Sequence, residues 1–170
     1  VIEGVEEARL VLVAVRHAVD LKGRRALLVD IGGGSVELTL LTDQAPHASV
    51  SLPMGTVRLH EAFLDHDAAV SAERRALLME YIERSLSEAE FLRGSMPDVV
   101  VATGGNAEAI ASLCPFATDD GNGIDVAAMR SLRDEMAALA PKARRERYGL
   151  RGDRADVIVP ALFVLSTVSF

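Results

Sequence analysis

Several features that would place this chain in a familiar class are missing from its sequence. It has one cysteine, Cys114, which excludes an internal disulfide bond and argues against a cysteine-based metal site. No apolar run reaches the roughly 20 residues that a membrane-spanning helix needs. No secretory signal is visible, because Val1 is followed at once by an acidic segment. We therefore expect a cytoplasmic protein in a reducing compartment, with no membrane partner.

Motifs of several common enzyme classes are also absent. The sequence contains neither the Gly-x-Ser-x-Gly turn of serine hydrolases nor the Gly-x-x-x-x-Gly-Lys-Ser/Thr loop of P-loop nucleotidases. The four histidines, which lack the spacing of metal ligands on one helix, are His17, His47, His60 and His66. Nothing in the sequence therefore indicates a nucleophilic serine, a P-loop or a histidine-bound metal.

Length, composition and charge suit one folded unit. At 170 residues, of which 49% are hydrophobic, the chain can build a sizeable core and is too apolar for a disordered segment. It shows no internal repeat or linker, so we predict a single domain over residues 1–170. The absence of an initiator methionine is what an excised piece of a longer protein would show. The net charge of −7 argues against binding to nucleic-acid polymers, so a polyanionic substrate would need local attraction.

The most informative stretch is the glycine-rich segment at residues 30–35, Asp-Ile-Gly-Gly-Gly-Ser. An apolar run enters it and an alternating run leaves it, which predicts a strand, a tight turn and a second strand. Glycine lacks Cβ, so this turn can take positive φ angles and let a ligand approach its N–H groups. Successive exposed N–H groups suit phosphate oxygens, and Asp30 is placed to hold a cation or a water beside them. The alternative is an ordinary hairpin turn that begins with Asp.

The rest of the pattern predicts an α/β domain with a mixed sheet. An antiparallel meander of three strands is expected first, and a buried parallel strand later. Ser71 is a suitable N-cap residue, Gly94 and Pro97 suit the end of the helix that it starts, and Pro160 suits a helix start or a kink. Polar residues at 42–46 predict the loop between the second and third strands. The predicted elements are a helix at 3–20, strands at 26–31, 35–42 and 47–53, helices at 56–64 and 71–93, a strand at 98–103, a helix at 106–113, a loop at 115–125, and helices at 125–139 and 155–170.

Five segments, in order along the chain, resemble those of the exopolyphosphatase and guanosine pentaphosphate phosphohydrolase (Ppx/GppA) family. Residues 1–10 resemble its sGxEEArL segment, 28–38 its DIGGGStEl loop, 51–59 its slplGavrL segment, 102–107 its GTGGTa turn and 154–158 its RADvI segment. Each match is weak alone, whereas the five together cover the chain from end to end.

The resemblance implies a ribonuclease-H-like domain of the actin-like ATPase superfamily, with the three-strand meander flanked by helices. In that family two such domains face each other across a cleft, and the first carries an Asp-x-Gly-Ser-Asn-Ser phosphate loop. No such loop is present here, so the chain resembles the second domain only, and we expect the isolated chain to be inactive. The implied activity of the whole enzyme is Mg²⁺-dependent hydrolysis of the terminal phosphoanhydride of polyphosphate or guanosine pentaphosphate. The alternatives are a non-catalytic phosphate-binding, nucleotide-binding or regulatory domain and, more distantly, an actin-like sugar or acetate kinase.

The same resemblance assigns roles to individual residues. Glu7 matches the carboxylate that activates water, with Glu6 as the alternative, although acidic residues at a helix start also suit the helix dipole. Asp30 matches a metal-holding or water-holding residue, and Glu37 would hold metal or orient the loop. The residues implied in phosphate binding are Gly32, Gly33, Gly34, Ser35, Arg58, Gly104 and Gly105.

Three segments that could bind phosphate could also have a purely structural or solvent-exposed role. Arg58 would equally suit a surface role, and the Gly104-Gly105 pair would also serve as an ordinary turn from strand to helix. The basic residues at 142–154 are either a solvated face or a rail for a polyphosphate tail. A homodimer of the full-length protein stays open, because the sequence is silent on oligomeric state.

Overall fold

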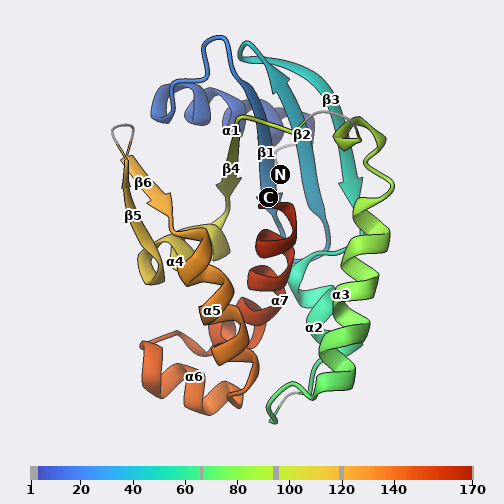
Figure 1. Ribbon diagram of the computed structural model, residues 1–170, viewed down its shortest axis with the longest axis vertical. Coiled ribbons are helices and arrows are strands. Elements are labelled where there is room, and N and C mark those ends of the chain that lie inside the picture. The colour runs from blue at the N-terminus through green and yellow to red at the C-terminus, as the bar shows by residue number, and fades with distance from the viewer. Residues whose placement is uncertain (1–3, 66, 94–95, 119–120, 170) are drawn as a thin grey trace.

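The computed structural model describes residues 4–65, 67–93, 96–118 and 121–169, with side chains described from residue 10 onward except at 121 and 122. One mixed sheet occupies the upper part of Figure 1, and most of the helices lie beside and below it. The strands are β1 (Arg25–Ile31), β2 (Val36–Thr42), β3 (Ala45–Leu52), β4 (Val99–Thr103), β5 (Pro115–Thr118) and β6 (Gly121–Ile124). The helices are α1 (Gly4–Ala18), α2 (Thr56–Phe63), α3 (Ala72–Leu86), α4 (Gly105–Leu113), α5 (Val126–Ala137), α6 (Pro141–Tyr148) and α7 (Gly152–Val168), with a 3₁₀ turn, η1 (Glu90–Leu92).

The main sheet confirms the predicted mixed α/β architecture. Its strand order is β3-β2-β1-β4, with β1 antiparallel to β2 and parallel to β4, and β2 antiparallel to β3. The turn between β2 and β3 is shorter than predicted, because Asp43 and Gln44 have φ angles of 47° and 67° and close a two-residue hairpin. Pro46 therefore lies within β3, an edge strand that tolerates a residue without an N–H.

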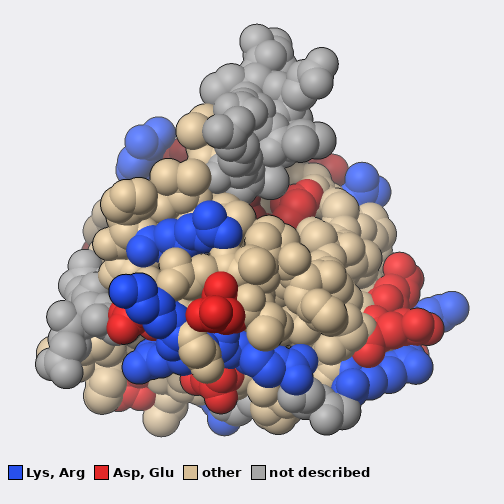
Figure 2. Space-filling view, turned by 90° about the horizontal axis from the view of Figure 1, so that it is seen from above, with Lys and Arg blue, Asp and Glu red and all other residues tan. Residues whose placement is uncertain are grey.

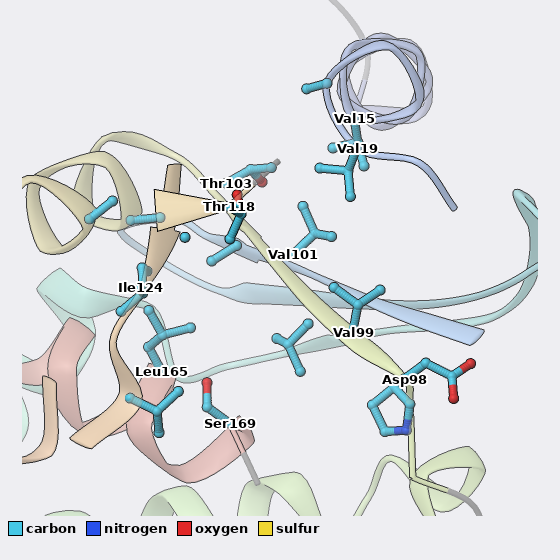
Figure 3. A pocket seen from close by; sticks show the side chains of 18 of the residues that line it. Val15, Val19, Asp98, Val99, Val101, Thr103, Thr118, Ile124, Leu165 and Ser169 are labelled. Atoms are coloured by element: carbon cyan, nitrogen blue, oxygen red, sulfur yellow. The ribbon is translucent and has the colours of Figure 1, made fainter. Parts of the chain in front are cut away.

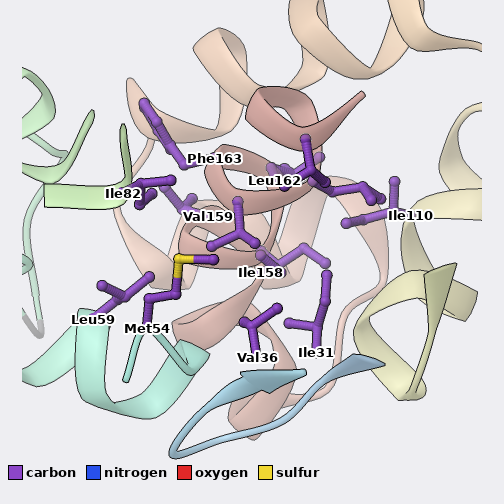
Figure 4. Close-up of a cluster of buried hydrophobic side chains, with 14 of the residues drawn as sticks. Ile31, Val36, Met54, Leu59, Ile82, Ile110, Ile158, Val159, Leu162 and Phe163 are labelled. Atoms are coloured by element: carbon purple, nitrogen blue, oxygen red, sulfur yellow. The ribbon is translucent and has the colours of Figure 1, made fainter. Parts of the chain in front are cut away.

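Side-chain alternation gives the sheet two apolar faces. On one face Leu27, Val29 and Ile31 pack against α7 and the helices around it, as Figure 4 shows for part of this cluster. On the other face Ala26 and Leu28 join a smaller cluster with residues of α1. Successive side chains of a strand point to opposite faces, so Asp30 continues this second row at the end of β1.

Helix α7 forms the centre of the larger cluster. Most of its side chains are buried, including Pro160, around which the helix continues without ending. It begins at Gly152, before the predicted start and well before the proline. None of the described helices combines the length and the apolar content that crossing a membrane requires.

Helix α3 begins as predicted and ends earlier than predicted. The Ser71 hydroxyl accepts a hydrogen bond from the Arg74 N–H, which is the expected N-cap. The helix ends at Leu86; Ser87 is its C-cap, with its hydroxyl donating to the Arg84 carbonyl at 2.6 Å, and Ala89 leaves the helical conformation with a ψ of 70°. Gly94, expected to end this helix, lies outside the described residues.

Three further segments differ from the sequence-based prediction. The expected loop at 115–125 contains a two-stranded hairpin, β5 with β6. Helix α6 was not predicted, because its basic residues indicated a surface run; it starts with Pro141 at its first position. Strand β4 is half-buried rather than buried, since no strand pairs with its outer edge in the described part of the chain.

Candidate phosphate-binding site

The glycine loop (residues 32–35) joins β1 to β2 and rests on the first turn of α2. The N–H groups of Thr56 and Val57 donate to the carbonyl oxygens of Gly32 and Gly33, both at 3.0 Å. Arg58 adds its main-chain N–H to the Gly33 carbonyl at 3.2 Å. The first-turn N–H groups of a helix have no partner within the helix, so the loop supplies the acceptors that α2 needs. The hairpin turn predicted at 30–35 is confirmed, and α2 holds it from one side.

Gly55 makes this contact sterically possible. A Cβ atom at this position would lie 2.3 Å from the carbonyl carbon of Gly34 and 2.3 Å from the nitrogen of Ser35. Its φ of −64° is accessible to any residue, so glycine is required here for space alone. The main chain of the loop therefore lies directly against the main chain that starts α2.

The hydrogen bonds to the loop leave three of its amides available. The Gly32 N–H donates to the Ser35 carbonyl at 3.0 Å, so this amide braces the loop instead of facing a ligand. No acceptor for the N–H groups of Gly33, Gly34 or Ser35 is found among the described residues. None of the three loop glycines has a positive φ, contrary to the expected reason for glycine in this turn. Three neighbouring exposed amides still form the kind of concavity that binds phosphate oxygens.

Polar side chains line up beside the loop on the face of the sheet that α1 covers. Asp30 is paired across the strands with Glu37 and with Thr103. Glu37 accepts hydrogen bonds from the hydroxyls of Ser35 at 2.6 Å and Ser51 at 3.0 Å. These two hydrogen bonds join its carboxylate to the loop and to β3. The hydroxyl of Thr103 is buried and has no hydrogen-bond partner among the described residues.

Asp30 and Glu37 fit a divalent cation in their chemistry and placement. Direct cross-strand partners have their Cβ atoms about 4.5–5.5 Å apart. Mg²⁺ commonly uses one or two carboxylates together with water and substrate phosphate oxygens, so it does not need a larger protein cage. Within the described ranges, no group of three or more His, Cys, Asp or Glu side chains could hold a metal ion.

The turn between β4 and α4 lies against the end of β1, directly before the glycine loop. Gly104 has a φ of 93°, and a Cβ atom there would lie 3.2 Å from the Ile31 carbonyl oxygen and 3.4 Å from an Asp30 carboxylate oxygen. Conformation and space both require glycine at this position. Helix α4 then starts at Gly105 with no side-chain cap. Its uncapped N-terminus favours negative charge and follows the Gly104 turn, which contacts the end of β1.

Arg154 is a residue of this site that the sequence analysis placed only in the basic run. Its guanidinium crosses the start of α4, with Nη2 2.7 Å from where a Cβ on Gly105 would stand. Its Nη1 donates to the Asn106 carboxamide oxygen at 2.6 Å. No carboxylate pairs with Arg154 in the described part of the chain. A cation at a helix N-terminus is unfavourable by itself, so this arrangement favours an anion between them. The signal in the sequence was the position of Arg154 at the head of the RADvI-like segment.

Of the two remaining predicted residues, the structure describes the side chain of Arg58 but not that of Glu7. Arg58 is exposed and its Nε donates to the Gly34 carbonyl at 3.1 Å, so it lies at the loop. Glu7 belongs to α1, and its side chain, like that of Glu6, lies outside the described part of the structure. The glycine loop, Asp30, Glu37, Arg58 and the Gly104-Gly105 turn are therefore brought together, whereas the placement of Glu7 stays a prediction.

The basic residues at 142–154 do not form a continuous rail. Arg144 is 2% exposed and donates to the main-chain carbonyls of Met136 at 2.8 Å and Ala155 at 3.2 Å. Burial lowers the pKa of Arg144 to about 10, with the charge of Asp156 acting in the opposite direction. The other described pairs that divide the run are Lys142 with Glu146, Arg147 with Glu135, and Arg151 with Asp153. Figure 2 shows a different face, where basic and acidic side chains are also intermixed.

A separate cavity of about 710 Å³ follows β4 on its unpaired side. Val99, Val101 and Leu165 are among the side chains that line it, and Figure 3 shows α1 above them. Most of these lining side chains are apolar; Thr103 at the end of β4 is shared with the site, and none of the loop residues is among them. The cavity therefore touches the site only at Thr103 and does not enclose the loop amides.

Comparisons with known proteins agree with this geometry. Exopolyphosphatase 1 of Mycobacterium leprae is 32% identical over 171 residues, which cover 96% of this chain and 50% of that protein. Guanosine-5'-triphosphate,3'-diphosphate pyrophosphatase of Aliivibrio fischeri is 38% identical over 85 residues, which cover 45% of this chain and 17% of that protein. The crystal structure of an exopolyphosphatase from Cytophaga hutchinsonii matches with a TM-score of 0.82 at 23% identity, over 98% of this chain and 56% of that one.

These matches settle the fold and the family. The structural match confirms the predicted ribonuclease-H-like, actin-like fold. The chain spans about half the length of the curated relatives it matches. The family model of the Ppx/GppA phosphatases matches residues 1–169. The chain therefore belongs to the Ppx/GppA phosphatase family.

Proposed function

We propose that the protein at its natural length hydrolyses the terminal phosphoanhydride of inorganic polyphosphate or of guanosine pentaphosphate. This chain supplies one wall of the site, and a second domain with its own phosphate loop supplies the other. The similarity to exopolyphosphatases supports polyphosphate as the substrate, and the shorter match to a guanosine-nucleotide pyrophosphatase supports guanosine pentaphosphate as the alternative. We also propose a cytoplasmic location and, for the full-length protein, either a monomer or a homodimer.

One observation carries the proposal: three loop amides lack an acceptor among the described residues, and beside the end of β1 the Arg154 guanidinium crosses the uncapped N-terminus of α4. Phosphoanhydride hydrolysis places negative charge on the transferring phosphoryl oxygens, and preorganised donors are usually the largest catalytic contribution. The amides of Gly33, Gly34 and Ser35 would bind those oxygens. Arg58 and the first turn at Gly105 would add positive charge from the two sides.

The acidic residues supply the other half of the chemistry. Asp30 and Glu37 would hold Mg²⁺, which when bound neutralises charge on the phosphate oxygens. The Glu7 carboxylate would accept a proton from the attacking water, and Glu6 is the alternative. The hydrogen bonds from Ser35 and Ser51 fix the Glu37 carboxylate beside the loop.

Phosphate release from both substrates tests the proposal. We expect the natural-length protein to release phosphate from one or both in the presence of Mg²⁺. The 170-residue chain alone should fold and release little or none, because removing even one preorganised donor costs roughly 10²–10³ in rate. Absence of release by the natural-length protein with either substrate would refute the proposal, and fast release by the short chain would refute the need for a second domain.

Substitution of the carboxylates tests their roles in the natural-length protein. Glu7→Gln keeps the side-chain size and removes the base, so turnover should fall by about 10²–10⁴ with little change in KM. Glu6→Gln is the matched control, and loss of turnover there with normal Glu7→Gln would move the base by one residue. Asp30→Asn should also raise the Mg²⁺ concentration needed for half-maximal rate. If neither glutamate matters, the Glu-Glu pair is only a helix start.

A second candidate is a domain that binds phosphate or a nucleotide without turnover. The share of the relatives that this chain covers, about half, favours this reading for the isolated chain. Isothermal titration of the 170-residue chain with a short polyphosphate, with and without Mg²⁺, would separate binding from hydrolysis.

A further inference from the structure

A chain of hydrogen bonds joins Arg154 to the glycine loop through two buried side chains. Arg154 Nη1 donates to Asn106 Oδ1 at 2.6 Å, and Asn106 Nδ2 donates to Thr56 Oγ1 at 3.4 Å. The Thr56 hydroxyl donates in turn to the Gly32 carbonyl oxygen at 3.4 Å. Asn106 is 5% exposed and Thr56 1% exposed, so both polar groups depend on these partners. The chain connects α7, α4, α2 and the loop.

The direction of each hydrogen bond follows from chemistry. A guanidinium can only donate, so Asn106 must present its oxygen to Arg154. Its NH₂ group is then the donor that faces Thr56, and the threonine hydroxyl keeps its own hydrogen for the Gly32 carbonyl. Within the loop, the Gly32 N–H donates to the Ser35 carbonyl and the Ser35 hydroxyl donates to Glu37, so further hydrogen bonds brace the loop. The three hydrogen bonds from Arg154 to the Gly32 carbonyl all point away from the cation, which polarises them in one sense.

The two linking residues lie 50 positions apart in the sequence and contact each other in the structure. The bond to the Gly32 carbonyl depends on the Thr56 hydroxyl.

We propose that Thr56 and Asn106 are positioning residues, which hold the Arg154 guanidinium and the glycine loop in one fixed relative placement. The inference rests on the proposed function, in which both groups bind the transferring phosphate. Arginine has a long, flexible side chain, and fixing its planar head in advance lowers the entropy lost when an anion binds. A misplacement of about 1 Å in such a site can cost roughly 10²-fold in rate.

Two substitutions that preserve shape test the link in the natural-length protein. Thr56→Val removes the hydroxyl, Thr56→Ser keeps it, and Asn106→Leu removes both the amide oxygen and the NH₂ group that take part in the link. Thr167→Val is the matched control, because this hydroxyl bonds the Phe163 carbonyl within α7 and not the loop. The measurements are kcat and KM for phosphate release from polyphosphate, and hydrogen exchange at the main-chain amides of 56–58, which donate to the loop.

We expect Thr56→Val and Asn106→Leu each to lower kcat by about 10- to 100-fold. They should also speed exchange at 56–58 by about 2- to 10-fold, the loss of one ordinary hydrogen bond. Thr56→Ser and Thr167→Val should behave as wild type. The double variant should lose little more than the worse single variant, because either change breaks the same chain.

Several results would overturn the inference. These are wild-type exchange and kcat in Thr56→Val, equal damage from Thr56→Ser and Thr56→Val, or independent effects of the two sites. Wild-type protein that hydrolyses neither substrate would instead refute the proposed function. Hydrogen exchange at 56–58 would still decide the positioning role, because it does not depend on turnover.

Discussion

Replacing Gly55 with alanine should separate the start of α2 from the glycine loop. The added Cβ would stand 2.3 Å from the Gly34 carbonyl carbon and 2.5 Å from that of Gly33. Carbon atoms in ordinary contact are about 3.5–4.0 Å apart, so the loop must retreat by roughly 1 Å. The atoms in the way belong to the main chain, so a change of side-chain rotamer cannot relieve the contact.

The expected cost follows from what this retreat breaks. Forced overpacking typically costs about 1–3 kcal/mol. The hydrogen bonds from the Thr56 and Val57 N–H groups to the loop, both 3.0 Å long, would be lost or weakened at about 0.5–1.5 kcal/mol each. Alanine restricts the unfolded chain and returns about 0.4–1 kcal/mol. The free energy of unfolding should therefore fall by about 1–5 kcal/mol, which at the middle of that range lowers Tm by roughly 6–12 °C for a domain of this size.

Urea and thermal unfolding of the 170-residue chain would measure this change. Gly34→Ala is the matched control, because nothing lies within 4 Å of a Cβ added there and its φ is not positive. Its unfolding free energy should stay within about 0.5 kcal/mol of wild type. Equal stability of Gly55→Ala and Gly34→Ala would refute the argument that the loop is held by direct main-chain packing on α2.

Three further predictions concern residues outside the loop. Arg144→Ala leaves the carbonyls of Met136 and Ala155 without their hydrogen-bond donor, so it should lower the unfolding free energy in urea titrations by about 2–6 kcal/mol. Lys142→Ala, at an exposed residue, is the control and should change that free energy by less than about 1 kcal/mol. Similar values for both variants would contradict a structural role for Arg144. Hydrogen bonds from its own N–H and from Ser71 lower the pKa of Glu73 below 4.5, so its stabilisation is present above that pH and is lost as pH falls through the folded-state pKa. The Tm difference between wild type and Glu73→Gln should accordingly be present at neutral pH and shrink as the pH falls through the folded-state pKa, and a difference that does not change with pH would contradict it. Burial, and secondarily Asp125, raise the pKa of the Cys114 thiol above 9.0, so thiol reagents at neutral pH should label it slowly until urea unfolds the chain; rapid labelling of folded protein would argue against this burial.

The sheet and its turns could be predicted because their signals are local. Alternation in β2 and the apolar run of β1 fix their faces, and a strand ending in Gly104-Gly105 before a helical pattern indicates a turn at the same sheet edge. The N-cap Ser71 could be predicted for the same reason, since it needs only its own side chain and the following amides.

The elements that sequence reasoning missed are set by non-local partners. The strands β5 and β6 are short and contain few strand-favouring residues, so only their pairing with each other identifies them. Helix α6 reads as a basic surface run until Arg144 is seen to be buried against the carbonyls of two other helices. At the end of α3 the Ser87 hydroxyl donates to the Arg84 carbonyl, but serine residues inside helices make such bonds as well, so the sequence does not mark this end.

At the site itself, the role of each glycine also depends on residues that are distant in the sequence. The three loop glycines suggested a turn with positive φ, yet none of them has one. The positions that demand glycine are Gly55, where only space is lacking, and Gly104, where both φ and space require it. A glycine in a sequence marks where a side chain is absent, and it does not say which neighbouring segment occupies the room. For the glycine loop, the neighbouring segment is the start of α2, which is 20 or more residues away in the chain. The N–H groups of α2 donate to the carbonyl groups of the loop, and three loop amides stay available. The anion-binding capacity of the loop is therefore a property of its contact with α2 as much as of its own sequence.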